Sequence, residues 1–359
     1  MTNQLEVILS NFKYNYNEIK KLVNPNTEIM PILKDNAYMT YINTQIDLLN
    51  ELGINIIGVA NAIEGENMRN LGFDKEIFIL NQPLTEDIER IAKNNLTIGC
   101  CSSEFIEKLG NYPANFNIHI EIGTGMGRTG INPYKISEFI ELMKKYSNIT
   151  VTGIYTHFSC SDSDEEYTRK QISIFNEAVS LIKENINTIK YVHACNSAGI
   201  INYPEAHFNL VRPGIILYGY YPCEELKEKL NLKPVAKLKS KISFLKEVPS
   251  NISISYGATF TTSRPSIIAT IPIGYSDGIC RSLSNKGSVV INKKIAPIVG
   301  TICMDSLMVD VTDIPANLND DVYIFDNENI TLDEIASLCN TINYEVLVGI
   351  SDKVERIFT

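Results

Sequence analysis

The strongest constraint on the fold is an alternation, across residues 10–225, of short apolar runs with amphipathic stretches rich in polar residues. A short apolar run is typical of a buried parallel strand, and helical spacing of apolar residues is typical of a helix that covers it. The runs recur at intervals of roughly 20 to 40 residues, the length of one strand-plus-helix unit. They lie at residues 29–33, 55–59, 77–80, 96–100, 117–122, 149–155, 191–194 and 209–211.

Eight strand-plus-helix units are the number that closes a parallel barrel, and a segment of about 215 residues has a usual size for one. A doubly wound open sheet would show the same alternation, so periodicity alone leaves both architectures open. The clearest helical patterns lie at residues 88–94, 104–109, 136–146 and 171–184.

Beyond residue 226, apolar β-rich runs follow one another with turns between them. This change predicts a second, mainly antiparallel β domain at 226–359, after an α/β domain at 10–225. The first strand-like run, at 5–9, is expected to join the β domain. The β-rich runs lie at residues 235–245, 267–272, 288–291, 295–302, 307–311 and 322–325, with a helical pattern at 332–341.

Composition narrows the class of protein. A net charge of −10 argues against nucleic acid or an anionic membrane as the main partner. No apolar run reaches about 18 residues, so no membrane span is expected. The eight cysteines are scattered, with Cys100 and Cys101 adjacent, which is a poor disulfide framework. No cysteine or histidine spacing predicts a metal site, and a reducing cytoplasm is the expected location.

Lys34 ends the apolar run at 29–33. The amine of such a lysine usually reaches solvent along its apolar stem, and this run alone favours that explanation. A buried lysine instead loses its proton easily and becomes a nucleophile, as a Schiff-base lysine must.

Residues 125–130 match the pattern G-x-G-x-x-G after a predicted strand. The match is weak as a dinucleotide-binding motif, because Pro133 interrupts the expected helix and no acidic residue follows the next strand. A glycine-rich turn that presents Arg128 from the carboxyl end of a barrel strand is favoured instead.

Other polar residues also follow predicted barrel strands. Each one alone is explained as a helix cap or a strand-end polar group. Together they would converge on one mouth of the barrel, as a site for an anionic cofactor requires, and the backbone N–H groups of residues 212–215 would suit a phosphate. The converging residues are Lys34, Arg128, His157, Asn196 and Arg212.

Several longer blocks resemble, in order and spacing, those of the alanine racemase family, from the strand at 5–9 to the C-terminus. They are PILKDNAY, GMGRTGI, THFS, NSAGI, RPGIILYG, SYGATF, ATIPIGYSDG and PIVGTICMDSLMVDVTD. The resemblance implies an N-terminal (β/α)8 TIM barrel that binds pyridoxal 5'-phosphate, followed by a C-terminal mainly antiparallel β domain. It also implies a homodimer with shared active sites, and interconversion of L- and D-alanine for bacterial wall synthesis.

The resemblance assigns roles to individual residues. Lys34 is similar to the lysine that binds the cofactor covalently, and Tyr256, supplied by the partner subunit, to the second base. Arg212 is similar to the arginine that donates to the pyridine nitrogen, and His157 would lie between that arginine and the tyrosine. The residues similar to a phosphate cradle are Tyr38, Ser197, Gly214, Ile215 and Tyr344. Those similar to residues that contact the substrate or shape access to it are Arg128, Met304, Tyr275 and Asp305.

The chain departs from the family pattern at several positions. Glu121 stands where many members have a lysine that becomes carboxylated and pairs with the substrate-binding arginine, so we expect Glu121 to hold Arg128 directly. Gly123 replaces an aspartate. Asp35 replaces an alanine, and residues 39–41 replace a glycine-histidine-glycine run.

Alanine is the favoured substrate, and the departures leave a family member that prefers serine or another amino acid as the alternative. A decarboxylase on the same two-domain plan would have an acidic partner for the pyridine nitrogen, where Arg212 stands here. A non-catalytic carrier of the cofactor would resemble the first domain alone, without the domain that carries Tyr256.

Overall fold

The computed structural model describes residues 3–359, which form two compact units. The barrel unit comprises Phe12–Ala37 and Ile42–Lys233. The β unit comprises the N-terminal residues through Asn11, the short segment Tyr38–Tyr41, and Pro234–Thr359. The chain thus passes from one unit to the other four times, twice within ten residues of Lys34.

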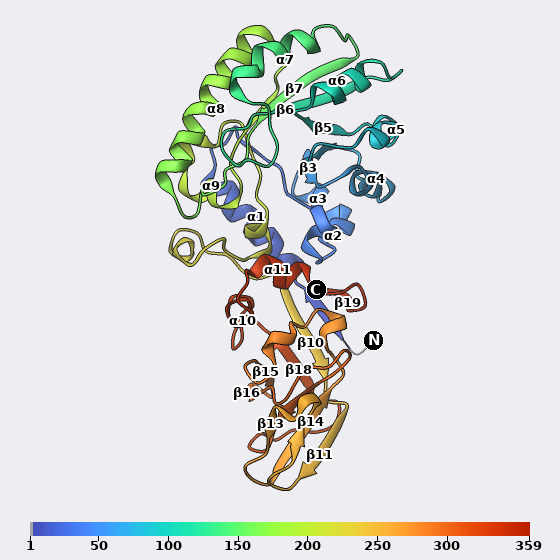
Figure 1. Ribbon diagram of the computed structural model, residues 1–359, viewed down its shortest axis with the longest axis vertical. Helices are drawn as coiled ribbons and strands as arrows, with labels where there is room; N and C mark the ends of the chain where they lie inside the picture. The colour runs from blue at the N-terminus through green and yellow to red at the C-terminus, as the bar shows by residue number, and fades with distance from the viewer. Residues whose placement is uncertain (1–2) are drawn as a thin grey trace. The chain divides into compact units, whose positions relative to one another are not determined.

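In the barrel unit, parallel strands follow one another in chain order (Figure 1). β3 to β8 form one sheet, and β2 pairs with β9. A parallel bridge between Ile32 and Gly58 joins β2 to β3, and the N–H of Arg212 donates to Cys195 O at 3.0 Å beside β8 and β9. The eight strands within the described residues therefore close into a barrel, and the predicted fold class is confirmed. Their bounds are β2 (Glu28–Ile29), β3 (Ile56–Val59), β4 (Glu76–Ile79), β5 (Thr97–Cys100), β6 (Phe116–Glu121), β7 (Ile149–Tyr155), β8 (Tyr191–His193) and β9 (Leu210–Val211).

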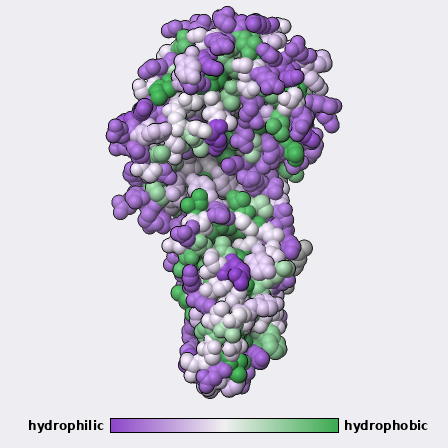
Figure 2. Space-filling model, in the orientation of Figure 1, coloured by the Kyte–Doolittle hydropathy of each residue, from purple (hydrophilic) through white to green (hydrophobic). Residues whose placement is uncertain are grey.

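Helices cover the barrel strands with amphipathic faces. In the longest of them the Asp164 side chain caps the first turn, and residues such as Ile172, Phe175, Val179 and Ile182 form the buried stripe. The opposite faces leave mostly hydrophilic residues on the visible surface of this unit (Figure 2). The helices are α1 (Leu9–Leu22), α2 (Lys34–Tyr38), α3 (Ile46–Glu51), α4 (Ala62–Asn70), α5 (Ile88–Lys93), α6 (Ser103–Gly110), α7 (Ile136–Met143), α8 (Glu165–Asn185) and α9 (Ser197–Asn202). Within residues 3–359, none of the helices is long and apolar enough to cross a bilayer.

The strand register decides which side chains enter the barrel. On β6, Phe116, Ile118 and Ile120 are buried on one face, while His119 and Glu121 have the opposite parity and are also buried. A central strand buried on both faces thus places an imidazole and a carboxyl group inside the barrel.

The β unit contains two principal sheets. One has the order β16-β15-β18-β10-β1-β19, in which β1 pairs antiparallel with β10 and parallel with β19. The other has the order β11-β14-β17. The larger sheet contains β1 (Gln4–Val7), β10 (Ala236–Lys241), β15 (Ser288–Ile291), β16 (Lys294–Pro297), β18 (Asp321–Phe325) and β19 (Glu355–Phe358), and the smaller contains β11 (Phe244–Val248), β14 (Ser266–Ile271) and β17 (Leu307–Asp310).

Short elements complete the β unit. Val248 and Ile268, from the smaller sheet, pack with Ile254 and Val299 into a hydrophobic core. The apolar run at 235–245 divides between β10 and β11, which lie in different sheets. The remaining elements are the hairpin of β12 (Ser253–Ile254) and β13 (Phe260–Thr261), the helices α10 (Leu332–Cys339) and α11 (Asn343–Val348), and the 3-10 turns η7 (Tyr256–Ala258) and η8 (Tyr275–Asp277).

Candidate active site

The carboxyl ends of the barrel strands bring most of the predicted polar residues to one mouth of the barrel. Active sites of such barrels form at this end, because the loops that follow the strands meet there. Lys34 lies beyond β2, Glu121 ends β6, and His157 follows β7. The loop after β8 contributes Asn196 and Ser197, and the loop after β9 contributes Arg212, Gly214 and Ile215.

Arg212 is the centre of this mouth. Its side chain is only 2% exposed, although it is a cation. Nη2 donates to the carbonyls of Thr156 and Ala194 at 2.8 and 2.9 Å, and Nη1 contacts Nδ1 of His193 at 2.8 Å. Burial lowers the pKa of Arg212 to about 10, so the group stays protonated at neutral pH. Its Nε has no hydrogen-bond partner among the described residues, which leaves one buried donor for an acceptor from outside the protein.

Two histidines extend this network into the barrel. A guanidinium can only donate, so Nδ1 of His193 accepts and its Nε2 carries the proton. That proton lies between His193 Nε2 and His119 Nδ1, which are 2.9 Å apart. His119 therefore carries its own proton on Nε2, 4.0 Å from Oε1 of Glu76. Burial lowers the pKa of His119 to about 3 and that of His193 well below its usual value, and the Arg212 charge adds to both effects.

His157 is next to the other terminal nitrogen of Arg212. Its Nδ1 is 3.4 Å from Arg212 Nη2. Burial and the positive charges of Arg212, Arg128 and Lys34 hold the pKa of His157 well below the usual range. A neutral His157 has one ring N–H to donate and one ring nitrogen that can accept.

Aromatic rings fill the space below the mouth. Tyr155 stacks on His193 with ring centroids 5.1 Å apart, and Phe78 stacks on His119 at 4.5 Å. The Arg212 guanidinium lies 5.8 Å from the Tyr155 ring centroid. These contacts exclude water from the barrel interior and restrict the Arg212 side chain.

The loops after β8 and β9 are hydrogen-bonded to each other. The N–H of Gly214 donates to Ser197 Oγ at 3.0 Å, which leaves the Ser197 hydroxyl proton to donate to another group. Ile215 begins the 3-10 turn Ile215–Tyr218. Both polar side-chain atoms of Asn196 are engaged with the protein, since Oδ1 accepts from Gly199 N and Nδ2 donates to Phe158 O. Asn196 thus caps α9 and holds the loop in place.

Glu121 lies beside a hollow that Arg128 and His157 also line. Its Oε1 accepts from Thr129 Oγ1 at 2.7 Å, and its Oε2 has no hydrogen-bond partner among the described residues. Burial raises the pKa of Glu121, while the Thr129 hydroxyl and the Arg128 charge act in the opposite direction. Glu121 therefore holds the residue next to Arg128 and keeps one oxygen available.

We expected Lys34 to end a strand, but the structure differs. Lys34 begins α2, whose turn is left-handed, because Asp35, Asn36 and Ala37 have φ and ψ near 50°. Positive φ continues at Tyr38, Met39 and Tyr41. A residue with a Cβ pays roughly 1–2 kcal/mol for this conformation, so surrounding contacts must hold the segment 35–41. We call residues 35–41 the left-handed segment.

The β unit gathers a second group of predicted residues. Tyr256, Met304 and Asp305 line one pocket of about 460 Å³, and the N–H of Tyr275 donates to Cys303 O at its edge. The Tyr256 side chain is 72% exposed and that of Met304 is 54% exposed. Both side chains line the same open pocket, so they are available to a ligand or a partner. Tyr38 and Tyr344, predicted for the phosphate, lie together elsewhere in this unit, with ring centroids 6.3 Å apart.

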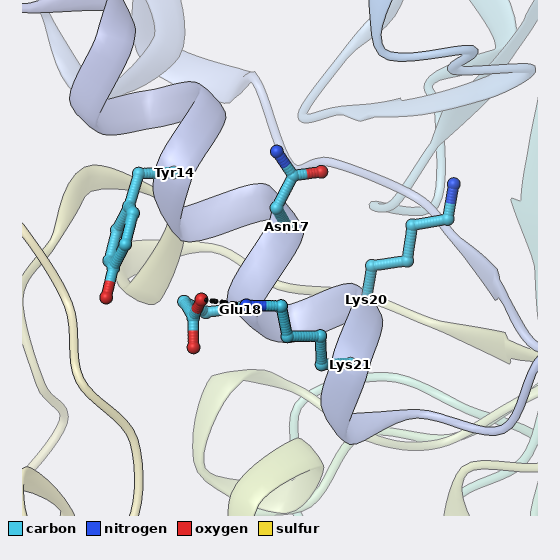
Figure 3. A pocket seen from close by; sticks show the side chains of 5 residues that line it. All are labelled: Tyr14, Asn17, Glu18, Lys20 and Lys21. Carbon is cyan, nitrogen blue, oxygen red and sulfur yellow. Dashed lines mark hydrogen bonds and ion pairs between the residues drawn. The ribbon is translucent and has the colours of Figure 1, made fainter.

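A separate hollow on α1 is lined by none of the predicted site residues. It is lined by residues of that helix alone, and an exposed ion pair of Glu18 with Lys21, 2.6 Å apart, lies across it (Figure 3). Such surface pairs contribute little to binding or stability.

The predicted site did not include His119 or Tyr155. His119 is inside β6, two residues before Glu121, and Tyr155 ends β7. The sequence did contain a signal for His119. Polar residues at 117, 119 and 121 alternate with apolar ones, and a parallel barrel buries both faces of such a strand, so one set of side chains must enter the barrel.

Comparison with known proteins covers both units. The model of the alanine racemase N-terminal domain matches residues 7–222, and that of the C-terminal domain matches residues 235–358. An alanine racemase from Methanococcus maripaludis is 41% identical, over 98% of this chain and 97% of its own length.

Solved structures agree with the sequence matches. The structure of an alanine racemase from Clostridium difficile 630 superimposes with a TM-score of 0.95 at 35% identity, covering 100% of this chain and 96% of its own. That of Bacillus anthracis alanine racemase with bound L-Ala-P has a TM-score of 0.94 at 31% identity, covering 100% and 95%. The chain therefore belongs to the alanine racemase family of pyridoxal-phosphate-dependent isomerases.

Proposed function

We propose that this protein interconverts L- and D-alanine with pyridoxal 5'-phosphate bound at the mouth of the barrel. The observation that carries the proposal is the buried, unpartnered Nε of Arg212 at the same mouth as Lys34. A buried donor without an acceptor is costly, so the site is suited to a ligand that brings one. The pyridine nitrogen of the cofactor is such an acceptor.

The residues at the mouth fit the rest of this cofactor. Lys34 would form the covalent bond, Arg212 would donate from Nε to the pyridine nitrogen, and the hydroxyl of Ser197 with the loop at Gly214 and Ile215 would hold the phosphate. Tyr38 and Tyr344 would complete the phosphate site. When bound, pyridoxal phosphate withdraws the electrons left behind when an α-proton is removed. Because Arg212 retains its proton, it would leave the pyridine nitrogen unprotonated.

Two bases would move the proton. Racemisation removes a proton from one face of the α-carbon and returns one on the other, so one base on each face is the direct solution. We assign these roles to the Lys34 amine and to the Tyr256 hydroxyl of a second copy of the chain. Tyr256 lines an open pocket with Met304 and Asp305, which supports a site that another subunit completes. The protein would therefore act as a homodimer with shared sites.

Arg128 and Met304 would meet the substrate carboxylate, with Tyr275 and Asp305 shaping access. Glu121 would orient Arg128, with its free Oε2 as the acceptor and its Thr129 hydrogen bond holding the adjacent backbone. The substrate is alanine in our proposal, on the strength of the relatives' names, and serine is the alternative to test first. The free thiols of all eight cysteines support the reducing cytoplasm as the location.

Two other functions are disfavoured by particular residues. A decarboxylase of this plan would have a carboxylate at the position of Arg212. A cofactor carrier would have no use for the β unit that presents Tyr256 at a pocket.

The test is covalent trapping combined with isotope exchange. Borohydride treatment of the protein with pyridoxal phosphate should modify Lys34, identified by peptide mass, and Lys34→Ala should abolish the modification. In deuterated water the wild-type protein should exchange the α-proton of alanine. Trapping at another lysine would remove Lys34 from its role, and trapping without exchange of any amino acid would support a carrier.

A further inference from the structure

The left-handed segment connects Lys34 to three fixed points. Five of its residues, 35–39, follow one another with positive φ, and none is a glycine. L-residues leave this conformation readily, since each places its Cβ close to a carbonyl oxygen. A side chain at one end of such a segment points in a defined direction only if other groups fix the segment.

Arg356, on β19, fixes the far end. Its Nε donates to the carbonyl of Met39 at 3.0 Å. Nη1 donates to the carbonyls of Ser351 and Val354 and Nη2 to that of Ile350, at 2.6–3.0 Å, so the guanidinium is itself held in place. Because the planar guanidinium of Arg356 donates to four carbonyls, it holds the Met39 backbone rigidly.

Asp352 adds a second contact at the same end. Its Oδ1 accepts from the Tyr41 hydroxyl at 2.6 Å, and the Tyr41 ring lies 5.1 Å below the Arg356 guanidinium. Met39 and Tyr41 both have φ near 60°, where glycine would be the unstrained choice. Tyr41 therefore compensates for its own strained backbone with a side-chain contact that glycine could not make.

Glu64, on α4, fixes the near end. Its Oε1 accepts from the N–H of Asp35, the residue after Lys34, at 2.9 Å, and its Oε2 accepts from Ala60 N at 2.7 Å. Burial raises the pKa of Glu64, while the hydrogen bonds from Ala60 N and Asp35 N and, more weakly, the Lys34 charge act in the opposite direction. Glu64 thus fixes the backbone of the residue that directly follows Lys34.

We propose that Arg356, Asp352 and Glu64 are positioning residues that hold the left-handed segment and so direct the Lys34 amine. This inference rests on the proposed role of Lys34 as the cofactor lysine. It assigns to the last ten residues of the chain a function in cofactor attachment, although none of them needs to touch the cofactor.

The experiment measures cofactor attachment in the full-length protein. Arg356→Gln should slow borohydride trapping at Lys34 at least about tenfold and weaken the retention of pyridoxal phosphate, since a misplacement of about 1 Å can cost on the order of 100-fold in the rate of a positioned reaction. Asp352→Ala and Tyr41→Phe remove only an exposed contact, and should cause smaller losses that do not add in the double variant. Arg264→Gln is the matched control, because Arg264 forms an exposed ion pair with Asp313 in the same unit.

Rescue separates positioning from a general loss of stability. Met39→Gly should recover part of the trapping lost in Arg356→Gln, because glycine adopts the left-handed conformation without strain. Glycine at this position would not restore a β unit that had simply lost stability.

Three outcomes decide the matter. Normal trapping and retention in both Arg356→Gln and Asp352→Ala would overturn the proposal, as would equal losses in the Arg264→Gln control. If Arg356→Gln does not fold, a loss of trapping in Asp352→Ala and Tyr41→Phe supports the proposal and normal trapping in both overturns it. Absence of trapping at Lys34 in the wild-type protein would instead refute the proposed function on which it rests.

Discussion

Nη1 of Arg212 donates to Nδ1 of His193 at 2.8 Å, and this contact decides where every proton of the buried network lies. It makes His193 a donor to His119 and leaves the proton of His119 on the nitrogen that faces Glu76. The cation at the mouth is therefore supported by neutral rings, with no carboxylate bonded to it among the described residues. Nothing in this network could take the proton from Arg212 at neutral pH.

Removal of the Arg212 charge should affect stability and cofactor binding together. Arg212→Gln leaves the carbonyls of Thr156 and Ala194 and Nδ1 of His193 without their donor, and we expect a loss of about 1–3 kcal/mol in the free energy of unfolding. Arg69→Gln is a matched control, since Arg69 also donates to backbone carbonyls of the barrel unit. Denaturant unfolding and cofactor titration should show both defects in Arg212→Gln and only the first in Arg69→Gln. Equal cofactor affinity in the two variants would contradict the assigned role.

The buried histidines should make the protein sensitive to acid. The folded-state pKa of His119 is about 3 and its ordinary value is 6.5, so between these values the unfolded chain binds the proton that the folded chain excludes. Stability should fall as the pH decreases from 6.5, by about 1.4 kcal/mol per pH unit for one such histidine. His119→Asn should reduce this slope in unfolding experiments at pH 7 and pH 5. An unchanged slope would show that His119 is protonated in the folded protein.

Glu121 should have the opposite dependence on pH. Burial raises its pKa in the folded protein, so stability should decrease as the pH rises from its ordinary value of 4.5 through the raised one. Glu121→Gln should remove this decrease and keep the hydrogen bond from Thr129. Without the negative charge beside Arg128 we also expect KM for alanine to rise about tenfold with little change in kcat, the pattern of a lost binding interaction. An unchanged KM would show that Glu121 does not orient Arg128 for substrate binding.

Tyr256 should matter for one enantiomer more than for the other. Tyr256→Phe removes one of the two proposed bases, and a positioned base contributes about 100- to 10,000-fold. Exchange of the α-proton in deuterated water, measured separately from L- and D-alanine, should show a large loss for one and a smaller loss for the other. Tyr134→Phe, at an exposed tyrosine of the barrel unit, serves as the control. Small and equal losses from both enantiomers would exclude Tyr256 as a base.

The barrel could be predicted because its signal is local. Each of the eight apolar runs overlaps a strand from β2 to β9, and the run at 149–155 coincides with β7. The division of the run at 235–245 was not predictable in this way, because the strand-like alternation of residues continues through Ile242 without a glycine or proline to mark a turn. Hydrogen bonds to different distant strands, β18 for one half and β14 for the other, decide where the chain turns.

The site was predictable where polar residues follow strands and not where they lie inside them. Asn117 and His119 have the same parity on β6, yet Asn117 is exposed and His119 is fully buried. Sequence shows that parity but not the depth of each residue along the barrel. The left-handed segment was missed for a related reason: its residues are ordinary L-residues, and contacts from Arg356, more than 300 positions away, hold their positive φ.

The most direct test of the account is the conversion of L-alanine by the purified protein with pyridoxal phosphate, followed by chiral separation of the products. The account predicts that L-alanine and D-alanine reach equal amounts from either starting enantiomer, and that Lys34→Ala abolishes the conversion. Racemisation of serine or another amino acid with none of alanine would contradict the proposed substrate. Cofactor binding at Lys34 without racemisation of any amino acid would contradict the proposed function itself.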